Sequence, residues 1–273
     1  SSNYAEDLRI DYSILDQHAE SYRKIRNTFR YLLGNINDNY ENINFEKVDL
    51  ANLPELEQLM LHKIYVLNDN FKRYFNNYDF HNLYKELLNF CTVDLSAFYF
   101  DIRKDNLYCD PKDSEKRKST ILVLNIILNA LLKWFAPILS FTAEEIFKLL
   151  FKDQKSIHLE KFLEFPDKFK NQKLSEKWSE LIKIRNICNI SIEEKRGNKE
   201  IGSSLEADLK INLNKKLQKL TNNIDFSELC ITSRAEITYD KVVELEVITK
   251  KMQGKKCPVC WKISPEICVR HPE

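Results

Sequence analysis

The chain has 273 residues, of which 43% are hydrophobic, and its 42 basic and 41 acidic residues give a formal net charge of +1. Length and composition predict a globular protein of one large domain or two smaller ones. The small net charge excludes nucleic-acid binding through a global positive field, so any such contact has to come from local clusters of lysine and arginine.

Cysteine usage and the apolar segments indicate where the protein works. Four of the seven cysteines are scattered singly, and three lie together near the C-terminal end, which excludes a disulfide framework and is typical of a reducing compartment. The opening residues, SSNYAEDLRID, lack the positive and apolar regions of a signal peptide. The most apolar run, 121–139, contains Asn125, Asn129 and Lys133, so we expect a buried helix and not a membrane span. These features predict a cytoplasmic protein without membrane contact.

The first predicted helix begins at Ser13, which we interpret as its N-cap. Apolar or aromatic residues then recur at steps of three and four, as on one side of an amphipathic helix. The stripe consists of His18, Tyr22, Ile25, Phe29, Leu32 and Ile36.

Further helices are predicted along the first part of the chain. A second begins near Pro54 and ends at NNYDF, and a third begins near Asp79 and gives way to DIRKDNLYCDPKDS, whose Asp, Asn and Pro residues predict a turn-rich link. A fourth covers about 114–135, and Thr142 with Glu145 predicts a capping box for a short fifth. Helices joined by short links predict an antiparallel bundle over residues 1–159.

The pattern changes in the second part of the chain. Residues 160–250 are predicted to form a junction domain, in which a helix over 173–196 precedes a small α+β unit. Short alternating runs, ADLKINL, ELCITS and ELEVIT, predict its strands, and a lysine-rich piece at 214–220 predicts a helix. Residues 251–273 are predicted to form an incomplete zinc-binding tail. The predicted fold class is therefore mainly α, with a small α+β domain and a truncated zinc knuckle.

One side of the first helix carries a cluster of arginines. Arg23, Arg26 and Arg30 stand at steps of three and four, with Asn27 beside them. The planar guanidinium group binds phosphates and base edges and stacks on unpaired bases, so this row is chemically suited to an RNA loop. The alternative is a solvated helix face that pairs with Glu20 and other acidic neighbours. Spacing alone leaves both interpretations open.

No catalytic motif is found. The sequence has no glycine-rich phosphate loop, no His-Glu-x-x-His pair and no spaced grouping of Ser, His and acid. We therefore expect the chain by itself to be inactive as an enzyme.

The tail KKCPVCWKISPEICVRHPE carries a candidate metal site. Cys257 and Cys260 have the spacing of a zinc knuckle, and so do Cys268 and His271, which together would supply a Cys3His set for zinc. A cytosolic Cys-x-x-Cys pair also has a redox interpretation, and the loop between the two pairs is short.

Several segments, in the same order, resemble bacterial-type isoleucyl-tRNA synthetases, which are class I enzymes. They are LRIDYSILDQHAESYRKIRNTFRYLLGN, NFCTVDLSAFYFDIRKD, WFAPILSFTAEEIF, SIHLEKF, EEKRGNKEIGSSLEADL and CPVCWK. The resemblance covers essentially the whole chain. It implies an enzyme that uses ATP to join isoleucine to isoleucine tRNA, with a separate editing domain. The family's HIGH and KMSKS signatures do not occur in the sequence, so the chain resembles the C-terminal, tRNA-recognising part of a monomeric synthetase, and ATP would belong to the missing catalytic domain.

The resemblance also bears on the site residues. It implies that Arg23, Arg26, Asn27 and Arg30 face the anticodon stem and loop, and that Trp261 stacks on tRNA. Family members commonly continue from Cys-x-x-Cys-Trp to a second Cys-x-x-Cys, which implies that Cys257 and Cys260 are zinc ligands and that Cys268 and His271 are loop residues or makeshift partners. The rival interpretation is a stand-alone helical module that binds RNA or protein and has no ligase activity.

Overall fold

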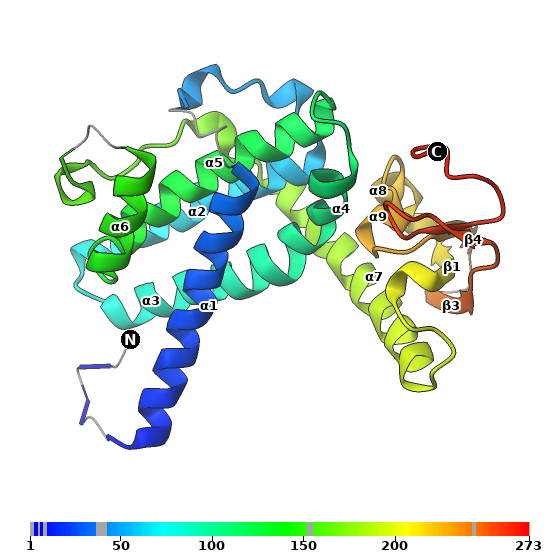
Figure 1. Cartoon of the computed structure of the whole chain (residues 1–273), viewed down its shortest axis with the longest axis horizontal. Coiled ribbons are helices and arrows are strands. Elements are labelled where there is room, and N and C mark those ends of the chain that lie inside the picture. The colour runs from blue at the N-terminus through cyan, green and yellow to red at the C-terminus, as the bar shows by residue number, and fades with distance from the viewer. Residues whose placement is uncertain are drawn as a thin grey trace. The chain divides into compact units, whose positions relative to one another are not determined.

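The computed structural model describes the following parts of the chain: residues 3–4, 6–7, 10–36, 43–151, 155–241 and 244–272. The chain forms two compact units, Ser1–Gln172 and Lys173–Glu273. The first is helical and the second combines helices with a small sheet, as Figure 1 shows. The prediction of a mainly helical protein with a small sheet region toward its C-terminal end is confirmed.

The first unit is built around one buried helix. Its helices are α1 (Tyr12–Ile36), α2 (Glu55–Asn76), α3 (Phe80–Asn89), the π-helical segment η4 (Phe90–Phe100), α4 (Asp101–Cys109), α5 (Glu115–Phe135) and α6 (Ser140–Leu150). Short 3-10 turns lie at η2 (Phe45–Lys47), η3 (Leu50–Asn52), η5 (Ile157–Leu159) and η6 (Asp167–Phe169). Helices α1, α2, α4 and α6 all pack against α5. The core of the unit therefore lies along α5.

Helix α5 is long and apolar enough to cross a membrane by length and composition, and no other helix of the described residues is. Of its most apolar 18-residue window, 67% is buried inside the protein. Leu124, Ile127 and Leu131 are fully buried, and so are the two aromatic residues Trp134 and Phe135. The helix is thus packed as a core helix, which agrees with the prediction made from its polar interruptions.

Both predicted side-chain caps at helix starts are wrong. Helix α1 begins at Tyr12, and the Asp11 carboxylate accepts a hydrogen bond from the backbone N–H of Ser13 (3.2 Å), so the helix begins two residues earlier than a cap at Ser13 predicts. Helix α6 begins at Ser140, two residues before Thr142. The Thr142 hydroxyl lies within the helix and is hydrogen-bonded to the Tyr22 hydroxyl (3.0 Å). At Thr142 a tertiary contact therefore uses the hydroxyl group that the local pattern assigned to a cap.

The predicted turn-rich link after the third helix is also wrong over most of its length. Residues 80–109 are continuously helical through α3, η4 and α4, and the break begins only at Asp110. Only some of the polar residues of α4 lie on its outer side, where Asp101 accepts a hydrogen bond from Lys104 (2.6 Å), whereas Arg103 is buried. Ile102 and Leu107 are buried on its inner side. Asp and Asn favour turns only weakly, and burial of an apolar face outweighs that preference here.

The segment that follows α6 packs on α2 and extends the first unit. The side-chain amide of Asn68 donates to the Leu163 carbonyl (3.0 Å), the Tyr65 hydroxyl donates to Asp167 (2.7 Å), and the backbone N–H of Asn171 donates to Nδ1 of His62 (3.0 Å). The first compact unit therefore ends 13 residues after the predicted boundary at 159. The three-part division of the chain itself stays a prediction.

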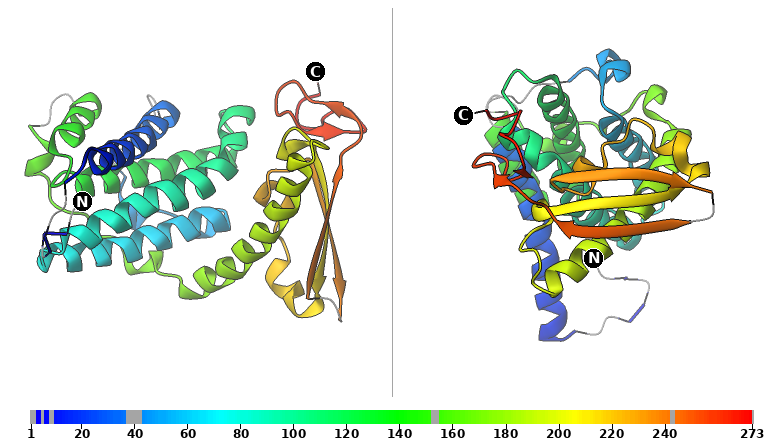
Figure 2. Two further views of the ribbon diagram at one scale, coloured as in Figure 1. Left: turned by 90° about the horizontal axis from the view of Figure 1, so that it is seen from below. Right: turned by 90° about the vertical axis from the view of Figure 1, so that its right-hand side faces the viewer.

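The second unit places a helix on one face of a three-stranded sheet. It contains α7 (Gln172–Gly197), β1 (Ala207–Asn214), β2 (Arg234–Asp240) and β3 (Leu245–Lys251). The strand order is β2-β1-β3, with β2 parallel and β3 antiparallel to the central β1. Figure 2 shows α7 along one face of the sheet. Alternate residues of β1, among them Leu209 and Ile211, are buried, as the alternation in ADLKINL predicted.

One of the three predicted strands is wrong. ELCITS falls on the end of α9 (Phe226–Leu229) and on the turn that follows, whereas the strand β2 comes directly after it. The Asp225 side chain caps α9 by accepting from the backbone N–H groups of Ser227 (2.8 Å) and Glu228 (3.2 Å), and Ile231 ends it with φ of 57°. The cap and the left-handed residue override the apparent alternation. The lysine-rich helical piece is confirmed as η8 (Lys215–Leu217) and α8 (Gln218–Thr221), and η7 (Ser204–Glu206) precedes β1.

Candidate nucleic-acid interface and metal centre

The arginine row lies on the exposed side of α1. Arg23, Arg26, Asn27 and Arg30 are all exposed. Ile25, Phe29 and Leu32 on the opposite side are buried against the core of the first unit. Because α-helical side chains three and four apart share a side of the helix, folding presents three guanidinium groups and one amide together. The sequence predicted this grouping, and its role in binding stays a prediction.

The three arginines differ in their partners. Arg23 donates to Glu20 (2.5 Å), in a pair whose side chains are 68% and 50% exposed. This is the pairing that the solvated-face interpretation expected, and it contributes little to stability at such exposure. For Arg26 and Arg30, the described residues provide no ion pair and no side-chain hydrogen bond. These two cations are therefore the ones best placed to bind an external anion.

A cavity of about 550 Å³ lies beside the row and shares Asn27 with it. It is lined by α1, η4 and α4, and residues such as Lys24, Tyr31 and Lys104 take part. Lys24, Tyr31 and Lys104 were not among the site residues predicted from the sequence. The sequence pointed to this cavity only through Lys24 and Asn27, which lie next to the arginines. The packing of α1 against η4, which forms the rest of the cavity, cannot be predicted from local sequence.

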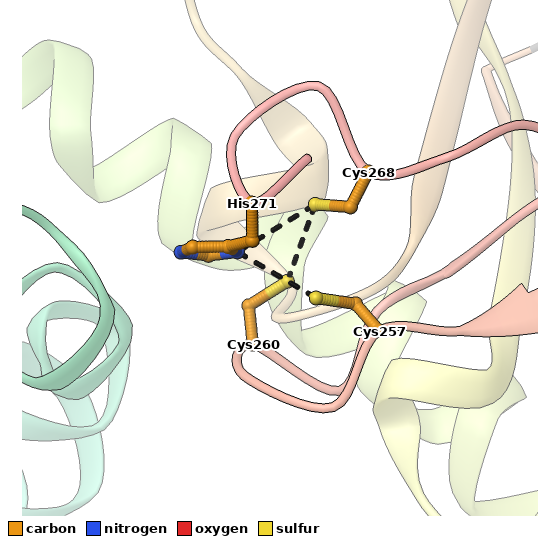
Figure 3. Close-up of side chains that lie close together, drawn as sticks. All are labelled: Cys257, Cys260, Cys268 and His271. Atoms are coloured by element: carbon orange, nitrogen blue, oxygen red, sulfur yellow. Dashed lines mark hydrogen bonds between the residues drawn. The ribbon is translucent and has the colours of Figure 1, made fainter. Parts of the chain in front are cut away.

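The four predicted metal ligands converge at one point, as Figure 3 shows. Their ligand atoms, three sulfurs and one ring nitrogen, all lie within 4.8 Å of one another. The Sγ atoms of Cys260 and Cys268 are 3.8 Å apart, and Nδ1 of His271 lies 3.6 Å from the Sγ atoms of Cys257 and Cys268. A tetrahedral zinc ion, with bonds of about 2.3 Å to sulfur and about 2.0 Å to nitrogen, separates its ligands by about 3.8 Å (S to S) and about 3.6 Å (S to N). The donor set and its spacing therefore fit zinc.

Both halves of this cluster are built in the same way. Burial raises the pKa of the Cys257 thiol, but hydrogen bonds from the backbone N–H groups of Cys260 and Val259 outweigh that and lower the pKa to about 6. At Cys268 burial again raises the pKa, and the backbone N–H groups of Arg270 and His271 lower it. In each half the N–H groups two and three residues ahead point at the first sulfur, which stabilises a thiolate. This repetition favours a second knuckle at Cys268 and His271 over makeshift partners.

Comparison with known proteins assigns the chain to a family. The family model described as the anticodon-binding domain of tRNA ligase matches residues 57–211. The chain belongs to this family. Its relatives include the isoleucine–tRNA ligase of Pelagibacter ubique, 67% identical over 100% of the chain and 30% of that relative. The isoleucine–tRNA ligases of Zymomonas mobilis and Agrobacterium fabrum are 40% and 37% identical, each over 98% of the chain and 28% of the relative. The chain thus spans about 30% of the length of these relatives.

Both candidate sites of this anticodon-binding chain lie outside the matched range. The arginine row precedes residue 57 and the metal ligands follow residue 211, whereas the similarity to the Pelagibacter ligase runs through both. The row belongs to the first compact unit, and the metal ligands and Trp261 belong to the second. The structure therefore groups the predicted residues into two separate sets.

Trp261 directly follows the first knuckle and is 58% exposed. Its ring lies 5.2 Å from Nζ of Lys256, in a cation–π arrangement. The other two tryptophans, Trp134 and Trp178, are buried. Trp261 also has φ of 63°, which is an uncommon conformation for a bulky side chain. The Trp261 ring is therefore not a core side chain, and its stacking on tRNA stays a prediction.

Gly254 fixes the approach of the tail to the metal centre. It precedes β4 (Lys255–Lys256), which pairs with β5 (Ile263–Ser264). Gly254 has φ of 134°, and a Cβ atom there would collide with the carbonyl group of Ser264. Only glycine accepts both this conformation and this close approach. The small hairpin therefore brings the first knuckle into position for the second.

Proposed function

We propose that the chain is the tRNA-recognition region of an isoleucine–tRNA ligase, with the antiparallel anticodon-binding bundle of class I enzymes. The observation that carries the proposal is the 67% identity, along the whole chain, to a relative with that name, together with the family match. Isoleucine, ATP and the joining reaction belong to the complete ligase. We expect this ligase to act as a monomer in the cytoplasm.

The arginine row is the contact that we assign to the anticodon stem and loop. With a net charge of only +1, the protein has to attract RNA through local clusters, and the row concentrates three guanidinium groups on about two turns of α1. Arg26 and Arg30 extend into solvent, where they can bind phosphates or stack on unpaired bases.

The tail supplies a second contact. We assign Cys257, Cys260, Cys268 and His271 as ligands of one zinc ion, which would act structurally because all four positions of its tetrahedron are filled by protein. The site would hold the short loop that carries Trp261. An exposed aromatic ring on a rigid loop can stack on an unpaired base without sequence preference.

Replacing Arg26 by alanine is expected to weaken binding of isoleucine tRNA by about 10-fold, since one arginine contact to nucleic acid contributes about 1–3 kcal/mol. Fluorescence anisotropy with labelled tRNA at one fixed salt concentration measures the effect. Arg73→Ala, on the exposed side of α2, is the matched control and should leave the affinity unchanged. Arg26→Lys should recover only part of the loss, because it keeps the charge without the planar fork. Equal affinities of Arg26→Ala and the unchanged chain would refute this assignment.

Replacing Trp261 by glycine is expected to weaken tRNA binding by about 5- to 10-fold, because one stacked base contributes on the order of 1–3 kcal/mol. Glycine adopts the left-handed conformation at no steric cost, so the tail itself should not lose stability. Trp261→Tyr keeps an aromatic face and is the control. Anisotropy gives the affinity, and hydrogen exchange of residues 255–272 gives the stability of the tail. Unchanged affinity of the glycine variant would show that the ring does not contact tRNA.

A further inference from the structure

The tail, residues 255–272, lies at one end of the three-stranded sheet of the second unit, as Figure 2 shows. At this end β1 and β2 begin and β3 ends, because Ala207 pairs with Lys251 and Asp208 pairs with Arg234. The short link 252–254 leads from β3 into the tail and sets where the tail starts. The orientation of the tail on the sheet depends on further contacts between the two.

One such contact is made by the hydroxyl group of Ser233, the residue directly before β2. The hydroxyl donates to the backbone carbonyl of Leu205, in η7, and accepts a hydrogen bond of 2.6 Å from the backbone N–H of Ile263, the first residue of β5. The backbone N–H of Ser233 donates to the carbonyl of Ala207 (3.2 Å), where β1 begins. The one proton of the hydroxyl is thus used on the sheet side and a lone pair on the tail side. Ser233 therefore joins the tail to the sheet.

The loop before β1 accepts both connections to the C-terminal part of the unit. The carbonyl of Leu205 binds the Ser233 hydroxyl, and the carbonyl of the next residue, Glu206, accepts from the backbone N–H of Met252 in the link (2.7 Å). The loop is itself closed by the backbone N–H of Gly202, which donates to the Glu206 carboxylate (3.2 Å). This loop belongs to the segment EEKRGNKEIGSSLEADL, which neither the arginine row nor the metal centre uses. Its carbonyl groups hold the link directly and the tail through Ser233.

A charge attraction acts at the same end of the sheet. Burial raises the pKa of the Asp225 carboxyl, at the N-cap of α9, but hydrogen bonds from Ser227 and Glu228 and the positive charge of Lys262 outweigh that and lower it. Lys262 precedes Ile263 in the tail, so this attraction draws the tail toward α9. A charge attraction has little directional preference, whereas a hydrogen bond does. The bond to Ser233 is therefore the contact that sets the orientation.

Trp261 is part of the turn that this bond orients. The backbone N–H of Trp261 donates to the carbonyl of Cys257 (3.0 Å), and the N–H of Cys257 donates to the carbonyl of Lys262 (2.9 Å). Residues 257–262 thus form one closed turn, and Ile263 directly follows it. A turn that is held at Ile263 presents its exposed indole ring in one direction relative to the sheet.

We propose that Ser233 is a positioning residue for tRNA recognition, because its hydroxyl fixes the orientation of the Trp261 ring toward bound tRNA. The inference rests on the proposed function, since it requires that Trp261 contacts tRNA. It adds that the strength of this contact depends on a residue that touches neither the RNA nor the metal. A ring that is already held in its binding orientation loses less conformational entropy on binding than a ring on a mobile turn.

The test removes the hydroxyl without touching the ring or the metal ligands. Ser233→Ala takes away the acceptor of the Ile263 N–H, and Ser233→Thr, which keeps a hydroxyl, is the rescue variant. Ser191→Ala is the matched control, because it removes a half-buried hydroxyl of α7 that is bonded to Thr249 at 2.7 Å. Thermal unfolding checks that each variant folds, and metal analysis compares its zinc content with that of the unchanged chain. Ser233→Cys, whose thiol is a weak acceptor, is the substitute if Ser233→Ala does not fold.

Ring motion and affinity are measured separately. In the NMR spectrum of the chain with isotope-labelled tryptophan, the indole signal that is missing from Trp261→Gly belongs to Trp261. Its heteronuclear NOE should fall in Ser233→Ala and recover in Ser233→Thr, because the freed turn gains motion on the picosecond to nanosecond timescale. Affinity for isoleucine tRNA, measured by anisotropy, should fall about 3- to 5-fold in Ser233→Ala, which is the loss expected when one further side chain has to be ordered on binding. Ser191→Ala should change neither quantity.

A double variant separates a positioning role from any other. Ser233→Ala combined with Trp261→Gly should bind tRNA no more weakly than Trp261→Gly alone, because Ser233 acts through the ring. The proposal is overturned if the two losses multiply, if the NOE is unchanged, or if Ser233→Ala loses zinc. If Ser233→Ala binds normally while Trp261→Gly binds weakly, the positioning role fails and the proposed contact of Trp261 stands. If neither change weakens binding, both fail.

Discussion

Replacing Arg103 by alanine is expected to lower the free energy of unfolding of the first unit by about 3–5 kcal/mol. Arg103 and Glu57 form an ion pair in the core, with side chains that are 3% and 0% exposed. The pair is bidentate, with Nε to Oε1 at 2.6 Å and Nη2 to Oε2 at 2.5 Å. Removal of the guanidinium would leave the carboxylate of Glu57 buried without its counter-charge, which costs more than the lost hydrogen bonds alone.

The surroundings of the pair make this loss hard to relieve. The hydroxyl groups of Tyr99 (3.2 Å) and Thr120 (3.1 Å) also donate to Oε1 of Glu57. Burial and the charge of Glu57 raise the pKa of Tyr99, which keeps it a neutral donor. The carboxylate of Glu57, on α2, thus binds side chains from three other segments of the bundle: η4, α4 and α5.

Urea unfolding followed by circular dichroism measures the change, with Lys104→Ala as the matched control. Lys104 is on the same helix but pairs with Asp101 at the surface, so its loss should change stability by less than about 1 kcal/mol. The double variant Glu57→Leu with Arg103→Met should be more stable than Arg103→Ala, because no unpaired charge remains. A loss below about 1 kcal/mol for Arg103→Ala would mean that water or another cation reaches Glu57.

The buried pair also shows where local sequence patterns stop being informative. The stripe of α1 and the apolar run of α5 could be read from the sequence because burial follows helical periodicity. Arg103 was placed in a turn because its neighbours are Asp and Asn, and its partner lies 46 residues away. A contact at that separation leaves no local signal. The same holds for Thr142, whose partner Tyr22 is 120 residues away.

The candidate sites also differ in how far local sequence predicts them. The arginine row and the two pairs of metal ligands are local spacings of three and four residues, and the structure brings each set together as those spacings predicted. The cavity depends on a π-helix packed on α1, and helical periodicity read as 3.6 residues per turn cannot place Cys91, Ser96 and Phe100 on one face. Clusters whose residues are close together in the sequence could therefore be predicted, whereas the cavity, which is formed by separate helices packed on one another, could not.

The largest expected effect concerns the metal. The unchanged chain is expected to hold about one zinc ion, and Cys257→Ser or Cys260→Ser should abolish it, because structural zinc contributes on the order of 10–16 kcal/mol to folding. Cys268→Ser and His271→Ala should also lose most of the zinc, while His271→Cys keeps it, since a thiolate can replace the imidazole. Cys109→Ser, outside the cluster, is the control. Metal analysis of the purified proteins gives the zinc content.

The alternative is that the first knuckle alone binds the ion, and Cys268→Ser and His271→Ala decide between the two. If both variants keep zinc as firmly as the unchanged chain against a competing chelator, Cys268 and His271 are loop residues. The structure favours the four-ligand site because the backbone N–H groups that stabilise the Cys257 thiolate have counterparts at Cys268.

Zinc removal should unfold the tail and leave the rest of the second unit intact. Residues 255–272 have only the two-residue strands β4 and β5, and their buried side chains are the ligands Cys257 and Cys260. So small a core cannot offset the conformational entropy of the loop without the metal. The sheet keeps its own core against α7, where the Ser191 and Thr249 hydroxyls are hydrogen-bonded at 2.7 Å. Chelation should therefore open trypsin sites at Lys255, Lys256 and Lys262 before any site in α7, and simultaneous cleavage of both would show that the metal supports the whole unit.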